Sequence, residues 1–214
     1  MPGSFFRSSH IRGVKEKAMI DRSTREKARN IVNLLQYQHV KIERLLRTFE
    51  RQLAKFEGSG PPDYGLMERT IALCVDCLDP HHRAVERPLL TALFEQNIVP
   101  GSSATTVDDE YVHVVESARR IATMIEAVFL DAELRREILS QIGHEFIDSC
   151  RHQMRLEEQT YFPAAIENLK ATDWAAIDKV ISTATKCVSD ERNGATGQAL
   201  HEKILSWDEI ESAA

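Results

Sequence analysis

Helical periodicity through almost the whole chain constrains the fold more than any other feature of the sequence. Glycine and proline cluster chiefly at 58–63 and 99–103, and the sequence between these clusters lacks strand signals. From about 23 to 57, apolar residues recur at spacings of three and four, which is typical of an amphipathic helix with one buried face. The sequence therefore predicts an all-α protein.

Four long helices are predicted between these breaks. Their expected ranges are about 23–57, 63–96 with Asp63 as N-cap, 108–129 with Asp108 as N-cap, and 131–169 starting at Asp131. Pro80 and Pro88 fall inside the second helix and Pro163 inside the fourth. Because proline removes a backbone donor, we expect a bend or break near position 80 and an irregularity near 163.

Four helices with short connections predict an antiparallel up-and-down four-helix bundle, which buries four apolar stripes together. We expect this bundle at 23–170, an N-terminal arm at 1–22 and a C-terminal helical extension at 171–214. The extension is predicted to hold one helix capped by Thr172 or Asp173 and a short helical segment at about 198–205. A single domain suits a chain of 214 residues.

Composition argues against several functional classes. The formal net charge of -6 gives no electrostatic footprint for nucleic acid or for an anionic membrane. No apolar run approaches the roughly 18 residues of a membrane span, and the first residues lack the apolar core of a signal peptide, so we expect a cytoplasmic protein. The lone CxxC of Cys74 and Cys77 lies in a helical apolar pattern and is interpreted as buried side chains rather than a redox or zinc site.

Four of the eight histidines fall amid core-facing positions, one on each predicted helix: His39, His82, His113 and His152. At about 1.5 Å per helical residue, His39 and His82 come level across their connecting loop, as do His113 and His152 across theirs. The loop between the second and third helices must absorb about 13 Å for the two pairs to meet. The spacing thus predicts a metal site in the centre of the bundle.

Carboxylates accompany two of these histidines. Glu86 follows His82 by four residues and shares its helix face, whereas Glu157 follows His152 by five, which requires a π-bulge. Imidazoles as terminal ligands and bridging carboxylates are how helical bundles hold two iron ions. Outside this set, Glu43 is a candidate to orient His39, and Glu158 is expected on a solvated face.

The motifs QHVKIERLL, HHRAVERPLL, EYVHVV and HQMRLEEQTYFP together resemble those of bacterial hemerythrin-like proteins with an HHE cation-binding domain. The resemblance spans nearly the whole chain and implies a hemerythrin-like bundle with two non-haem iron ions. Transferred position by position, it implies that the metal ligands are His39, His82, Glu86, His113, His152 and Glu157.

The chain also departs from the family pattern. Val85 precedes Glu86 where relatives often have a second glutamate, so matching through Glu86 makes His82 the ligand. Alignment through Glu157 places Gln153 where many bacterial relatives have histidine, whereas His152 fits the spacing of oxygen-carrying hemerythrins. If Gln153 faces the site, the centre could be mononuclear, weakly bound or lost.

The resemblance implies that the protein binds or senses O2 or a related small oxidant, or handles iron, with binding expected rather than catalysis. Two alternatives stay open. One is a di-iron enzyme that repairs damage or handles peroxide or nitric oxide. The other is a metal-free bundle that acts as an interaction module, motivated by Val85, Gln153 and by Ser117, where oxygen-carrying relatives have another histidine.

Overall fold

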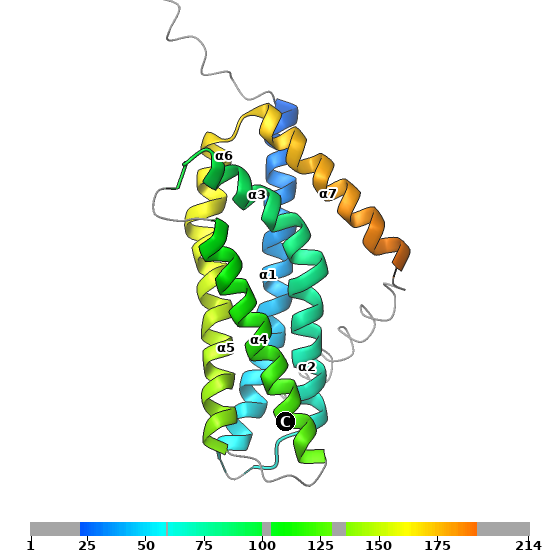
Figure 1. The fold of residues 1–214 in the computed structure, drawn as a ribbon, viewed down its shortest axis with the longest axis vertical. Helices are drawn as coiled ribbons and strands as arrows, with labels where there is room; N and C mark the ends of the chain where they lie inside the picture. Colours follow the sequence, from blue (N-terminus) through cyan, green and yellow to red (C-terminus); the bar gives the residue numbers. More distant parts are fainter. Residues whose placement is uncertain (1–21, 59, 100–103, 130–135, 192–214) are drawn as a thin grey trace, which may run out of the picture.

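The computed structural model describes residues 22–58, 60–99, 104–129 and 136–191, and every regular element among them is helical (Figure 1). The all-α prediction is confirmed. In chain order the elements are α1 Arg22–Glu57, α2 Tyr64–Asp76, η1 Cys77–His82, α3 Arg83–Glu95, α4 Ala104–Phe129, α5 Arg136–Leu156, η2 Glu157–Tyr161, α6 Phe162–Asn168 and α7 Ala171–Glu191, where η1 and η2 are π-helical. None of the described helices combines the length and the hydropathy needed to cross a membrane.

Four helices, α1, α2, α4 and α5, lie side by side and form a bundle (Figure 1). Their facing stripes bury a first core that includes Leu46, Phe49, Met67, Ile121 and Phe146. The helices approach closely at Gly143, where an added Cβ would lie 2.8 Å from Leu53 Cδ2. Phe49 and Phe146 meet edge to face, with ring centroids 6.4 Å apart.

A second core lies at the other end of the bundle, where α7 crosses α3 and the first turns of α1 (Figure 1). It is centred on the fully buried Trp174, with Leu35, Leu89, Leu93 and Leu169 in the same cluster. Because these residues come from α1, α3 and the segments around α6 and α7, the extension after the bundle completes a hydrophobic layer. The candidate site lies between the two cores.

Both π-helical segments contain a proline or closely precede one. In η1 the N–H of Arg83 donates to the carbonyl of Leu78, and in η2 the N–H of Phe162 donates to the carbonyl of Glu157, both five residues back. Pro80 lies within η1 and Pro163 lies two residues after the end of η2, so each removes a donor from the ordinary four-residue ladder. The expected break near position 80 and the irregularity near 163 are confirmed.

The structure agrees with the predicted start of α2 and differs from the predicted start of α4. Asp63 is the N-cap of α2 and accepts from the N–H of Leu66 at 2.8 Å, as expected. The prediction for Asp108 is wrong, because α4 begins at Ala104 and Asp108 pairs across helices with Arg83 and Arg87.

The remaining predicted ends lie around α5 and α7. Helix α7 begins at Ala171, so neither Thr172 nor Asp173 is its N-cap. Asp173 lies within the first turn and accepts from the N–H of Lys170 at 2.8 Å, which satisfies a donor at the start of the helix. The predicted start at Asp131, the segment 198–205 and nearly all of the arm at 1–22 lie outside the described residues.

Candidate metal centre

His39 lies on the inward stripe of α1, one turn from Leu35 on one side and from Ile42 on the other. Its side chain is 3% exposed. Leu35 belongs to the second core and Ile42 to the first, so His39 lies where one core gives way to the other. The Phe162 ring stacks against the imidazole with centroids 5.7 Å apart and restricts its orientation.

The two π-helical segments each supply one further residue at this level. His82 ends η1, and Glu157 begins η2. Both are buried, each with 5% of its surface exposed. A π-turn widens the helix and shifts the angular position of the residues that follow, so such turns are frequent at functional sites.

These three side chains converge. Glu157 Oε2 lies 3.1 Å from His39 Nε2 and 3.5 Å from His82 Nε2, and the two imidazole centroids are 4.9 Å apart. One potential ligand atom from each residue lies within 4.8 Å of the other two. Two neutral imidazoles and a carboxylate so placed can hold one metal ion.

Each imidazole is also fixed from behind through its other nitrogen. His39 Nδ1 lies 2.7 Å from Glu158 Oε1, and His82 Nδ1 lies 3.1 Å from the amide oxygen Oε1 of Gln38. Since both partners accept, each Nδ1 carries a hydrogen, and Nε2 is the ring nitrogen that faces Glu157; a metal ion would replace the proton that His39 Nε2 donates to Glu157 Oε2 in its absence. Outer partners of this kind orient metal-binding histidines and raise their basicity.

Charge in the group is divided unequally between two carboxyl groups. Burial raises the pKa of Glu157, but hydrogen bonds from His39 and His82 outweigh it and hold the pKa at about 2. Burial and the nearby charge of Glu157 instead raise the pKa of Glu86 well above its usual range, although Arg83 opposes this. Glu157 is therefore the ionised member of the pair.

Glu86 lies at the edge of the group. Its Oε2 is 3.9 Å from His82 Nε2 and 3.4 Å from a guanidinium nitrogen of Arg83. Arg83 is in turn held by Asp108 and lies over the Tyr111 ring, 4.6 Å from its centroid. Glu86 is thus near enough to complete a ligand set with a small side-chain movement.

The structure does not bring the other two predicted ligands into this group. His113 on α4 and His152 on α5 are both exposed to solvent. In their place, Tyr111 of α4 and Gln153 of α5 line a small cavity together with His82, Glu86 and Glu157. The register in which Gln153 faces the site is the one observed.

The sequence contained a signal for this register. On α5 the buried residues Phe146 and Cys150 continue, in steps of three and four, to Gln153 and Glu157 rather than to His152. On α4 the buried Val114 and Ala118 continue backward to Tyr111, and His113 falls about 100° away from that stripe.

Two carboxylates near His39 also exchange their expected roles. Glu43 pairs with Arg47 and Arg151 rather than with the imidazole. Glu158, which was expected on a solvated face, holds His39 although its side chain is 42% exposed. Burial lowers the pKa of His39, whereas the hydrogen bonds and charges of Glu157 and Glu158 raise it. The two glutamates have the larger effect, so the pKa of His39 is raised.

The small cavity beside the group has a volume of about 20 Å³. Its apolar wall includes Ile42, Leu78 and Met154, and its polar wall is formed by Gln153 and the carboxylates. That volume accommodates roughly one water-sized molecule. A ligand of two atoms or so could therefore approach the side of the group formed by His82 and Glu157.

Comparison with known proteins gives one family. The family model described as hemerythrin HHE cation binding domain matches residues 30–165, well over half of the chain. The matched range includes His39, His82 and Glu157, and Glu86 at the edge of the group. Neither curated proteins nor solved structures give a match.

Proposed function

The chain belongs to the hemerythrin HHE cation-binding domain family, and from that premise we propose that it binds one non-haem iron ion through His39, His82 and Glu157. The convergence of two imidazoles and one carboxylate between the two cores carries the proposal. The site is buried and its imidazoles are already oriented. A metal ion should therefore bind more tightly here than at a solvent-exposed cluster of acidic residues.

A single ion, rather than the two expected from the family resemblance, suits the arrangement better. A second iron would need donors from α4 and α5, but His113 and His152 are exposed on those helices. Gln153 and Tyr111 line the corresponding side of the cavity, and the neutral amide of Gln153 is a weaker ligand for iron than imidazole. We therefore propose that the second position of the family centre is lost.

Iron is favoured by the composition of the donor set. Two histidines and one carboxylate that leave coordination positions open are typical of non-haem Fe(II) sites. Zinc also accepts two histidines and a glutamate, so the two metals must be distinguished by measurement. Glu86 would supply a fourth donor from the same helix turn as His82 and would lose its proton on binding.

The small cavity supports binding of O2 or another small oxidant as the role of the site. Bound Fe(II) would supply an electron and an open coordination position for such a ligand. The residues of the chain would restrict access to about one small molecule, and Gln153 would offer an amide donor beside it. Sensing of an oxidant or handling of iron would both use this arrangement.

The test is the metal content of the full chain. Protein purified from iron-supplied cells, or loaded anaerobically with Fe(II), should contain about one iron per chain by elemental analysis, with zinc measured in the same samples. The Glu157→Gln variant keeps the shape of the side chain and should lose most of the iron. A content near two per chain would restore the di-iron expectation, and no iron in the wild type would instead favour a metal-free interaction module.

A further inference from the structure

A solvent-open cleft of about 460 Å³ lies between α1 and α5, beside the candidate metal centre. His39 and Glu158 line it where it meets the centre. Arginines line the rest on both helices: Arg44 and Arg47 from α1, and Arg151 and Arg155 from α5. A cleft of this volume falls in the range of small-molecule sites.

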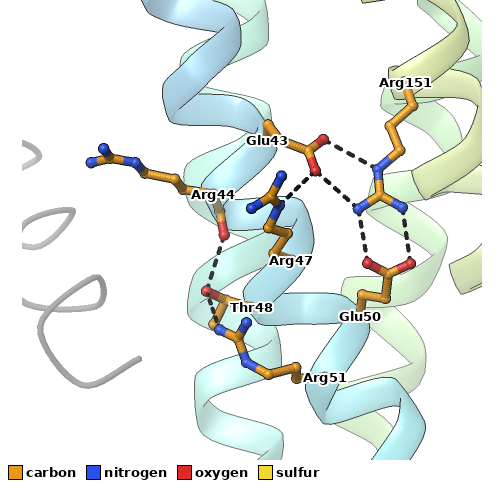
Figure 2. A network of polar contacts seen from close by, with 7 residues as sticks. All are labelled: Glu43, Arg44, Arg47, Thr48, Glu50, Arg51 and Arg151. Atoms are coloured by element: carbon orange, nitrogen blue, oxygen red, sulfur yellow. Dashed lines mark hydrogen bonds and ion pairs between the residues drawn. The ribbon is translucent and has the colours of Figure 1, made fainter. Parts of the chain in front are cut away.

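One of these arginines is held rigidly. Arg151 donates to both carboxylate oxygens of Glu43, at 3.1 Å each, and to both of Glu50, at 2.8 and 2.9 Å (Figure 2). Arg47 also donates to Glu43, at 2.9 Å. This network joins α1 to α5 and occupies the oxygens of Glu43 and Glu50, which leaves them little capacity to neutralise further arginines.

The charges of the other two arginines are not neutralised by a carboxylate of the described residues. Among the described residues, neither Arg44 nor Arg155 has an ion-pair partner, and both are exposed. Figure 2 shows the Arg44 guanidinium extended away from Glu43 and Arg151. Four arginines thus line the cleft, with Glu43 and Glu158 in its lining and Glu50 paired to Arg151, so the arginines exceed these carboxylates by one in a chain whose overall formal charge is -6.

We propose that this cleft binds a small molecule carrying two or more carboxylate or phosphate groups. The guanidinium of arginine is always charged and presents a planar fork of donors that matches both groups. Arg44 and Arg155 lie on different helices, so a ligand with separated anionic groups can engage both at once. Arg151, which is neutralised by Glu43 and Glu50, fixes α1 against α5 and so holds the two helices that carry Arg44 and Arg155.

The proposal does not depend on the iron site, because none of the four arginines belongs to the ligand group. A bound anion would lie beside Glu158, whose carboxylate already holds His39. The cleft thus gives an anionic molecule a path from solvent to the edge of the candidate centre at His39 and Glu158.

The test uses the full chain after removal of metal with a chelator and desalting. Citrate and tripolyphosphate are titrated separately by calorimetry at low ionic strength, since exposed charges are screened by salt. Arg44→Gln combined with Arg155→Gln should weaken binding by about tenfold or more. The matched control combines Arg119→Gln with Arg120→Gln, which removes the same charge from an exposed part of α4 and should leave affinity within about twofold.

Binding of citrate alone would identify the carboxylate as the preferred group, and binding of tripolyphosphate alone the phosphate, provided that the cleft variant weakens it. The proposal is overturned if the wild type binds neither probe. It is equally overturned if the control pair weakens binding as much as the cleft pair, since the attraction would then come from net charge alone.

Discussion

The two sides of the candidate centre differ in how they use histidine. On the side formed by α1 and η1, His39 and His82 are buried, fixed through Nδ1 and directed at Glu157. On the side formed by α4 and α5, His113 and His152 are exposed and the inward positions hold Tyr111 and Gln153. His152 is the neighbour of Gln153 and His113 lies two residues from Tyr111, so the angular position around the helix decides which side chain faces the centre.

This contrast also explains where the helices deviate from regular geometry. Both π-helical segments lie at the level of the centre and carry His82 and Glu157, whereas the parts of α4 and α5 that hold His113 and His152 are regular helix. A local widening of the helix costs hydrogen-bond geometry. Among the residues that the structure describes, π-helical geometry occurs only in the two segments that carry the buried polar residues His82 and Glu157.

The largest effect should come from the histidines themselves. His39→Ala or His82→Ala should weaken iron binding by more than about 100-fold, because each removes a ligand from a buried set of three. His113→Ala and His152→Ala should leave it within about twofold, since both side chains face solvent. Competition against a chelator of known affinity measures all four, with circular dichroism as a check of folding. Strong loss in the second pair would bring α4 and α5 back into the site.

A smaller effect is expected one step outside the ligands. Glu158→Gln keeps an acceptor for His39 Nδ1 but removes the charge, so iron affinity should fall by about tenfold. The control is Glu116→Gln, which neutralises an exposed glutamate on α4. Equal affinities in the two variants would mean that Glu158 does not orient the imidazole.

The reactivity of the cysteines should likewise differ between buried and partly exposed positions. Burial raises the pKa of Cys150 to about 12 and that of Cys74 well above its usual range, so both stay as unreactive thiols at neutral pH. Cys77 is only half-buried and should react first with a thiol reagent. In a Cys187→Ser background, mass spectrometry after timed labelling should find Cys77 modified before Cys74 and Cys150. Rapid labelling of either buried thiol would contradict the packing of the first core.

The smallest effect concerns the exposed ion pairs. The hydrogen bond from Arg151 lowers the pKa of Glu50, against a rise from burial. A carboxylate with a lowered pKa in the folded state stabilises the fold above its unfolded pKa and loses that contribution as the pH falls through the acid range. Because Glu50 is 42% exposed, Glu50→Gln should cost at most about 1 kcal/mol at pH 7, and the cost should be smaller at pH 3, where the carboxylate begins to take up a proton. Urea unfolding at the two pH values measures the difference, and an equal cost at both would exclude an electrostatic origin.

The sequence by itself determined the helical class, the family and the buried half of the site. His39 lies on the apolar stripe of its helix, and the spacing of His82 and Glu86 places both on one face, so periodicity alone locates them. The break at Pro80 followed from the missing backbone donor. These features depend on residues close together in the chain.

Tertiary structure decided the rest. The spacing of Phe146 and Cys150 indicates that Gln153 rather than His152 continues the buried stripe of α5, but only the packing of that stripe in the first core places Gln153 beside His82 and Glu157. The hydrogen bond between Glu158 and His39 joins residues 119 positions apart. Asp108 does not cap its helix but forms an ion pair with Arg83 of α3, which packs nearby. Such contacts are set by the packing of all the helices together, and local spacing carries no record of them.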